Sequence, residues 1–301
     1  MTASNPQAEA MEQALEDAEL KRHGQFYFMV RRFCRNKAAV VALVFVILLV
    51  IAAIFCDYLT PYDYAEQNLL EKLQGPSLAH LCGTDNFGRD IFTRILRGAR
   101  VSLLVALAGV CMSTVVALIL GSLAGYYGGV VDNVIMRVMD MLIAIPGLLL
   151  SMTVSAALGT GMIKTAIALA IPGVAQLTRQ LRSSIMTMKN SEYIEASRAF
   201  GGSDLHILIR HIIPNCLSPL IVQFTLSLGS GIMSISGLSF LGLGVQPPTP
   251  EWGNMVAAGQ DYLRTAPHMV LFPGLAVMLA MLAFNLLGDG LRDALDPRMK
   301  Q

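Results

Sequence analysis

The sequence predicts an all-α protein that crosses a membrane several times, and two features of its 301 residues carry that prediction. Hydrophobic residues make up 54% of the chain and charged residues only 14%, with a mean hydropathy of +0.57. Soluble domains are about one quarter charged. Uncharged runs recur along the chain, and a helix needs ~20 apolar residues to cross the hydrocarbon core. These features predict a polytopic helical membrane protein and argue against a soluble enzyme.

Six uncharged runs define the expected transmembrane helices. They cover residues 38–56, 101–131, 141–163, 165–178, 211–250 and 265–288. The fourth run is short, and it becomes a span if Arg179 and Arg182 lie at its inner boundary, where long side chains reach the headgroups. The sequence therefore predicts six transmembrane helices, the first at 38–57.

The distribution of Lys and Arg sets the expected orientation, because cytoplasmic loops are enriched in both. With the N-terminus inside, 15 of the 22 basic residues lie on the cytoplasmic side and 7 outside. Residues 1–37 and 290–301 then form cytoplasmic tails, and 58–97 form an extracytoplasmic loop. One feature opposes this assignment, a cluster of outer basic residues formed by Arg89, Arg94, Arg97 and Arg100.

Helix packing and bending also leave sequence signals. Gly121, Gly125 and Gly129 are spaced four apart, which favours either close helix packing in lipid or a flexible helix end. Pro146 and Pro172, each followed by Gly, are expected to kink their helices. A further expectation is that Asp140 pairs with a basic residue three positions earlier, Arg137.

Metal, nucleotide and nucleic-acid sites are not expected in this chain. A net charge of +1 provides no basic surface, and the histidines and cysteines lack metal-ligand spacing. Cys56 and Cys82 are the one pair that could meet outside, but an odd count of five cysteines is poor support for a disulfide. Lys164 follows Ile163 rather than the glycine that a phosphate loop requires, so this chain is not expected to hydrolyse ATP.

The connection between the fourth and fifth expected spans, 189–214, carries the most specific local pattern. Ser191 is placed to cap a short helix whose first turn is acidic, and Gly201 follows its last turn. A second short helix is expected up to Pro214. One face of the first helix has small or apolar residues at helical spacing, namely Tyr193, Ala196, Ser197 and Phe200. An acidic first turn suits an anionic membrane surface poorly, so we interpret this helix as a docking element for a cytosolic protein.

The same connection resembles the EAA loop of bacterial ABC importer permeases. Glu195-Ala196-Ser197, three residues, Gly201, nine residues and then His211-Ile-Ile-Pro214 match the family pattern EAA-x3-G-x9-I-x-L-P. The departures are a serine for the second alanine, a histidine for the first isoleucine and an isoleucine for leucine. Neither the glycine nor the proline position is disturbed.

Further segments are similar to the second permease subunit of peptide-type importers, the peptide/nickel transport family. They are 83–90 with Arg94 and 98–100, then 239–244, 246–253 and 284–297. The resemblance extends from about Arg35 to Lys300. It implies the type I ABC importer permease fold, with residues 98–289 as the permease core and 189–214 as the cytoplasmic coupling loop.

The resemblance also implies function and partners. A homologous permease would complete the translocation pore, two cytosolic ATP-binding subunits would supply ATP and magnesium, and an extracytoplasmic binding protein would deliver di- or oligopeptides. Localisation in the bacterial cytoplasmic membrane, with both termini inside, is implied as well. Six residues are implied to couple the chain to an ATPase, namely Glu195, Ala196, Ser197, Phe200, Gly201 and Pro214.

Three other interpretations remain open at this point. Glutathione or chelated nickel could replace peptides as the substrate, because selectivity lies largely in the binding protein. A secondary transporter or channel would need an ionisable coupling site near mid-membrane, and the long uncharged runs provide none. A membrane-embedded hydrolase would need paired catalytic groups within a span, and no such constellation is present in the sequence.

Overall fold

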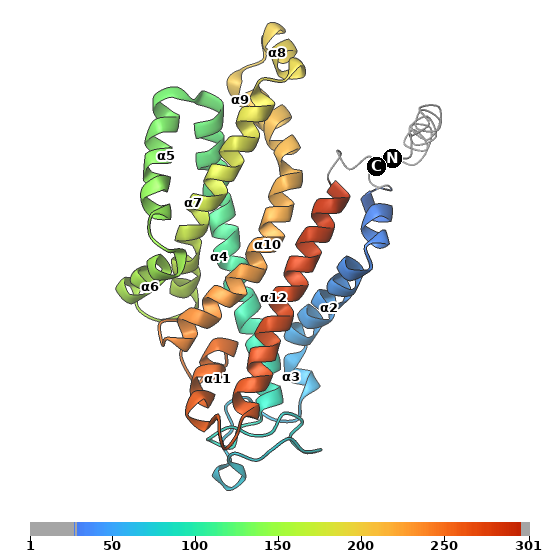
Figure 1. Ribbon diagram of the computed structural model, residues 1–301, viewed down its shortest axis with the longest axis vertical. Coiled ribbons are helices and arrows are strands. Elements are labelled where there is room, and N and C mark those ends of the chain that lie inside the picture. The colour runs from blue at the N-terminus through green and yellow to red at the C-terminus, as the bar shows by residue number, and fades with distance from the viewer. Residues whose placement is uncertain (1–26, 28, 296–301) are drawn as a thin grey trace, which may run out of the picture.

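The computed structural model describes residue 27 and residues 29–295, and Figure 1 shows long helices running side by side. No strand occurs in this part of the chain, which confirms the all-α prediction. The long helices are α2 (Lys37–Ile54), α4 (Ile91–Tyr127), α5 (Gly129–Ile143), α6 (Gly147–Leu158), α7 (Met162–Lys189), α10 (Ile213–Phe240) and α12 (His268–Leu295). The shorter ones are α3 (Cys56–Leu59), η1 (Leu69–Glu71), α8 (Glu192–Ala199), α9 (Asp204–Ile207), η2 (Leu208–Ile212), α11 (Trp252–Gly259) and η3 (Gln260–Tyr262).

Two ends of the bundle are distinct in Figure 1. The α8 end holds α8 and α9 together with the beginning of α2 and the end of α12. The α11 end holds α3, α11 and the loops between α3 and α4. Because α2 and α12 run in opposite directions along the bundle, the beginning of one and the end of the other reach the same side.

Four of the helical stretches are long and apolar enough to cross a membrane. They are α2, α4, the continuous stretch Asp204–Phe240 and α12. The bent pair α5 and α6 makes a fifth if it counts as one span. The 28-residue α7 is more polar, since it carries Arg179, Arg182 and Lys189. The predicted multi-span architecture is thus present, and the count of six spans stays a prediction.

The third expected span differs most from its prediction. Residues 141–163 do not form one straight helix, because α5 ends at Ile143 and α6 begins at Gly147 at an angle of 90°. Pro146 occupies the N-cap of α6, where its missing N–H costs nothing. The expected kink at Pro146 is therefore a complete break.

Two of the three spaced glycines hold α4 against α7. A Cβ atom at Gly121 would lie 2.9 Å from the Cβ of Leu181, and one at Gly125 would lie 2.9 Å from the Cβ of Ile185. Gly129 instead has open space around it and a φ of +55° in the turn between α4 and α5. The first two glycines permit close helix packing, and the third permits the turn.

Ion pairs connect α5 to α7. Asp140 accepts a hydrogen bond from Arg179 at 2.5 Å, so the expected pairing with Arg137 is wrong. Asp132 receives both Nε and Nη2 of Arg182 in a bidentate contact. The partner of Asp140 is therefore a residue of the neighbouring helix α7.

Two aspartates pair with the four arginines of the outer basic cluster and offset half of their charge. Asp85 pairs with Arg89 at 2.7 Å and with Arg94 at 3.7 Å. Asp57 pairs with Arg97 and, at 3.3 Å, with Arg100. Each of the four arginines thus shares one of two carboxylates, and the cluster still counts against the orientation that the other basic residues predict, because that rule depends on Lys and Arg themselves.

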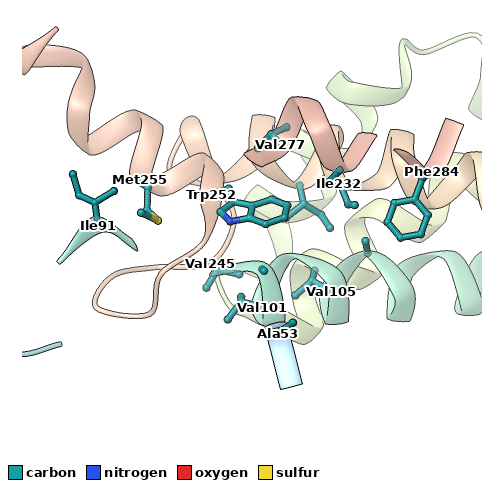
Figure 2. Close-up of a cluster of buried hydrophobic side chains, with 14 of the residues drawn as sticks. Ala53, Ile91, Val101, Val105, Ile232, Val245, Trp252, Met255, Val277 and Phe284 are labelled. Carbon is teal, nitrogen blue, oxygen red and sulfur yellow. The ribbon is translucent and has the colours of Figure 1, made fainter. Parts of the chain in front are cut away.

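A core cluster at the α11 end surrounds Trp252, whose side chain is fully buried. Figure 2 shows the indole between Val105 of α4, Ile232 of α10 and Val277 of α12. The indole Nε1 donates a hydrogen bond to the carbonyl oxygen of Ile95 at 3.0 Å. A large aromatic residue with a satisfied polar atom thus ties α11 to three of the long helices.

The five cysteines all lie within the described residues and form no disulfide in the structure. Cys56 and Cys82 are both buried and both free. Burial, with the nearby Asp90 carboxylate adding to it, raises the pKa of the Cys82 thiol to about 11. At neutral pH this thiol is protonated, so it is a poor nucleophile.

Candidate functional site

The connection between α7 and α10 forms the most projecting part of the α8 end in Figure 1. α8 covers Glu192–Ala199, close to the helix that the sequence predicts. Ser191 occupies the N-cap, but its hydroxyl donates to the carbonyl oxygen of Met188 at 2.7 Å instead of capping α8. The expected role of Ser191 as a side-chain cap is therefore wrong, although its position is right.

Gly201 terminates α8 in a well-defined way. It has a φ of +83°, a left-handed conformation that favours glycine. The N–H of Gly201 donates to the carbonyl oxygen of Arg198, and the N–H of Gly202 donates to that of Ser197. This is the Schellman arrangement, which satisfies the last carbonyl groups of the helix and fixes the direction in which the chain leaves it.

One residue anchors α8 to the bundle. Ile194 is fully buried, and it is the only buried residue of α8. It belongs to a cluster with Ile185 of α7, Ile207 of α9 and Ile212 of η2. α8 is therefore packed against the ends of the long helices that contribute to this cluster.

Polar contacts around Tyr126, near the end of α4, add to that attachment. Its hydroxyl donates to Asp204 of α9 at 2.6 Å. The ammonium of Lys189 lies 5.6 Å from the centre of its ring and donates to its carbonyl oxygen. Arg198 of α8 stands over the same ring at 5.7 Å. Four segments thus meet at one aromatic side chain.

The predicted docking face of α8 points away from the bundle. Phe200 is 92% exposed, and Tyr193 is 47% exposed. Ala196 and Glu195 are exposed as well, while Ser197 is half-buried. Glu195 has no hydrogen bond or ion pair within the described part of the chain. α8 therefore exposes an apolar and acidic surface on one side, while Ile194 packs against the bundle on the other side.

Pro214 does not end a helix, contrary to the expected second helix up to that residue. α9, the π-helical turn η2 and α10 form one continuous stretch, Asp204–Phe240, and Pro214 lies in the first turn of α10. A proline lacks the N–H of a helical bond, and the widened turn directly before it accommodates that loss. The connection therefore leads into a span without a flexible joint.

A polar cavity lies about midway along the long helices, and the sequence interpretation did not identify it. Its volume is about 240 Å³, and α4, α6, α7 and α10 all contribute to its wall. The side chains with hydroxyl or amide groups include Ser113, Ser151, Gln176, Gln223, Ser227 and Ser230. The only sequence signal was the presence of uncharged polar residues within apolar runs. Those residues indicate a shared cavity only once the structure shows that four helices bring them together.

Comparison with known proteins identifies the family to which the chain belongs. Residues 117–301 match the family described as binding-protein-dependent transport system inner membrane component. The chain belongs to this permease family. Residues 25–76 match the N-terminal transmembrane domain of oligopeptide transport permease C. The chain is thus a multi-pass membrane protein of the ABC importer permease type.

Curated relatives agree over most of their length. The chain is 46% identical to a glutathione transport system permease protein of Pectobacterium atrosepticum over 271 residues, 90% of each chain. It is 46% identical to a dipeptide transport system permease protein of Alkalihalophilus pseudofirmus over 88% of each chain. A di/tripeptide transport system permease protein of Pseudomonas aeruginosa is also 46% identical, over 89% of this chain and 90% of the relative.

Proposed function

We propose that this permease forms half of the translocation pathway of an ATP-driven importer for di- and oligopeptides. Relatives named for dipeptides and di/tripeptides support peptides as the substrate. The relative named for glutathione, a tripeptide-like solute, keeps that substrate as the alternative. A homologous permease, two cytosolic ATP-binding subunits and an extracytoplasmic binding protein complete the machine, with ATP and magnesium held by the ATP-binding subunits. The permease itself is non-catalytic and binds no cofactor.

Residues 189–214 serve as the coupling loop of this permease. The single observation that carries this assignment is the two-sided character of α8. Ile194 is buried in the cluster that joins α7, α9 and η2, while Phe200 on the free side is 92% exposed. A force applied to the exposed face by an ATPase is transmitted to the long helices through a packed contact rather than through a loose loop.

The orientation follows from the same assignment. α8 must face the cytosol to meet an ATPase, which places the beginning of α2 and the end of α12 on the cytosolic side as well. The excess of basic residues on that side supports this orientation. Both termini are then cytoplasmic, and the α11 end faces the binding protein.

The test is co-purification of the permease with its ATP-binding subunits, followed by peptide uptake in proteoliposomes. Glu195→Lys reverses the charge of an exposed side chain, and Gly201→Val forces a β-branched residue into a φ of +83° at a cost of about 1–3 kcal/mol. We expect both variants to insert into the membrane at wild-type levels while losing most ATPase association and uptake. Wild-type uptake by both variants would contradict the assignment.

A matched control is available at Gly75. A Cβ atom at this loop glycine has no neighbour within 4 Å, and Gly75 has no left-handed φ. Gly75→Ala is therefore expected to behave like the wild-type chain. Gly98 would be a poor control, because a Cβ atom there would lie 3.1 Å from the indole of Trp252.

A further inference from the structure

The polar cavity contains hydrogen-bonding groups that the chain itself does not satisfy. Ser151 is only 2% exposed, yet no hydrogen bond of its hydroxyl occurs in the described part of the chain. The amides of Gln176 and Gln223 line the same space, and neither has a hydrogen-bond partner within residues 29–295. Unpaired amides and hydroxyls are costly in hydrocarbon, so these side chains are suited to water or to a polar ligand rather than to lipid tails.

The serines of the cavity are mainly available as acceptors. Ser113 donates its hydroxyl hydrogen to the carbonyl oxygen of Val110, and Ser230 donates to carbonyl oxygens one helical turn earlier. Their oxygen lone pairs remain free for a ligand. The two glutamines add both donors and acceptors. The wall therefore offers the groups that pair with peptide N–H, peptide C=O and terminal ammonium groups.

The cavity adjoins the break between α5 and α6. Gly147 and Leu148, the first residues after the break, line the space directly. Interrupted backbone at membrane depth is tolerated where it is buried in protein or lines an aqueous cavity. The 90° bend is a second, independent indication that this wall faces a polar passage.

The lining residues described carry no charge. The nearest ionisable groups on α7 are Arg179 and Arg182, and each is paired with an aspartate of α5. A pathway lined in this way exerts little attraction or repulsion on the side-chain charge of a passing solute.

We propose that this wall contacts the solute during transit and binds main-chain and terminal groups of a short peptide through neutral hydrogen bonds. It therefore accepts peptides with little regard to side-chain charge. This inference rests on the proposed function and adds the contact surface and the chemistry of recognition.

The test introduces one charge into the wall of the assembled importer. In proteoliposomes that contain the permease, its partner permease, the ATP-binding subunits and the binding protein, uptake of a lysine-containing and an aspartate-containing dipeptide is compared. We expect Gln223→Glu to raise the ratio of cationic to anionic uptake by about threefold or more relative to wild type, because Gln223 is half-buried and a partly buried carboxylate is screened less than a fully exposed one. Gln260→Glu makes the same change in an exposed turn outside the cavity and should leave the ratio unchanged.

A conservative variant provides an independent measurement. Ser230→Cys is made in a chain whose exposed Cys34 and Cys111 are replaced by serine. In the assembled complex, a small water-soluble methanethiosulfonate should label the new cysteine and block uptake, and excess peptide during turnover should slow the labelling. This variant adds no charge and little volume. It therefore tests contact between the solute and the wall even if the Gln223→Glu complex fails to assemble.

Two outcomes would overturn the proposal. An unchanged uptake ratio for Gln223→Glu in an intact, ATP-hydrolysing complex would mean that the solute does not contact the wall. An unlabelled Ser230→Cys, together with loss of the partner permease from Gln223→Glu, would mean that the wall is a contact between the two permeases. Failure of the proposed function differs from both, because the wild-type complex would then take up neither peptide.

Discussion

Glu251 and Trp252 at the α11 end are both fully buried, whereas at the α8 end a single isoleucine is the only buried residue of α8. The Glu251 carboxylate accepts hydrogen bonds from Ser102 at 3.1 Å, from Ser236 at 3.3 Å and from the backbone N–H of Asn254 at 3.1 Å. α8 itself is held by Ile194 and by the contact of Arg198 with the Tyr126 ring, and its exposed Glu195 has no hydrogen bond or ion pair in the described chain. The α11 end is therefore held together by contacts within the chain, whereas the exposed face of α8 is available to contact another protein.

The difference in packing between the two ends indicates which end of the permease is more resistant to displacement. Segments far apart along the chain, such as α4 and α11, are joined at the α11 end by buried polar and aromatic groups, and separating them would expose all of those groups at once. At the α8 end the attachment consists of the apolar cluster around Ile194 and the contact of Arg198 with Tyr126. In the coupling proposed above, a push on α8 displaces the adjoining ends of the long helices as a unit, while the α11 end acts as the fixed point.

The largest expected effect is at the fixed end. Trp252→Ala removes a fully buried side chain that contacts three long helices, and such changes cost about 3–5 kcal/mol. We expect a strongly reduced amount of permease in the membrane and a lowered thermal-unfolding midpoint in detergent. Tyr58→Ala, which alters an 87% exposed aromatic residue, is the matched control. Equal thermal stability of the two variants would remove the contrast between the ends.

The next largest effect is expected at the anchor of α8. Ile194→Ala leaves a cavity in a packed cluster at about 2–5 kcal/mol, but this cluster is separate from the one around Trp252. Membrane levels should stay near normal, because the core around Trp252 is untouched, while ATP hydrolysis becomes uncoupled from uptake. Measuring both rates in the assembled complex checks this. If hydrolysis and uptake fell in the same proportion, the anchor would not be the transmitting contact.

Two substitutions of Glu251 distinguish the contribution of its charge to stability from that of its hydrogen bonds. Glu251→Leu leaves two hydroxyls and a backbone N–H without their acceptor, at about 1–3 kcal/mol. Glu251→Gln keeps one oxygen for these donors and should cost less. Thermal unfolding of the two variants in detergent provides the comparison. A glutamine variant as unstable as the leucine variant would show that the negative charge itself is required.

The smallest effect is expected for the ion pair between Arg100 and Asp57. Both side chains are about half exposed, and exposed pairs contribute below about 1 kcal/mol. Arg100→Ala should lower the unfolding midpoint slightly, and the loss should diminish further at high salt. A loss as large as that of Trp252→Ala would mean that the arginine cluster, and not the aromatic core, fixes the α11 end.

Several features could be read directly from local sequence. Uncharged runs predicted α2, α4, α10 and α12, which are long and apolar enough to cross a membrane, because hydrocarbon imposes the same requirement on every residue of a span. The EAA-like pattern placed α8 to within a residue or two, and Gly201 has the left-handed conformation that its position predicted. Each of these features depends on interactions between residues close together in the chain, so the local sequence is sufficient to predict it.

Other features depended on which helices become neighbours. Asp140 lies three residues from Arg137 yet pairs with Arg179 of another helix, and the run 141–163 bends by 90° at Pro146. The aspartates that pair with the arginine cluster are also identified only by proximity. No local pattern specifies these partners, because charge and shape are matched between segments that lie far apart in the chain.

By itself, then, the sequence determined that this protein is a helical membrane permease, where α8 begins and ends, and which glycine terminates it. These follow from backbone chemistry and from the hydrophobic requirement of the bilayer. Only the tertiary structure decided that Ile194 is the anchor, that the apolar face of α8 remains free, and that Ser151, Gln176 and Gln223 share one cavity. These depend on the packing of helices against one another, which brings together residues that the chain holds far apart.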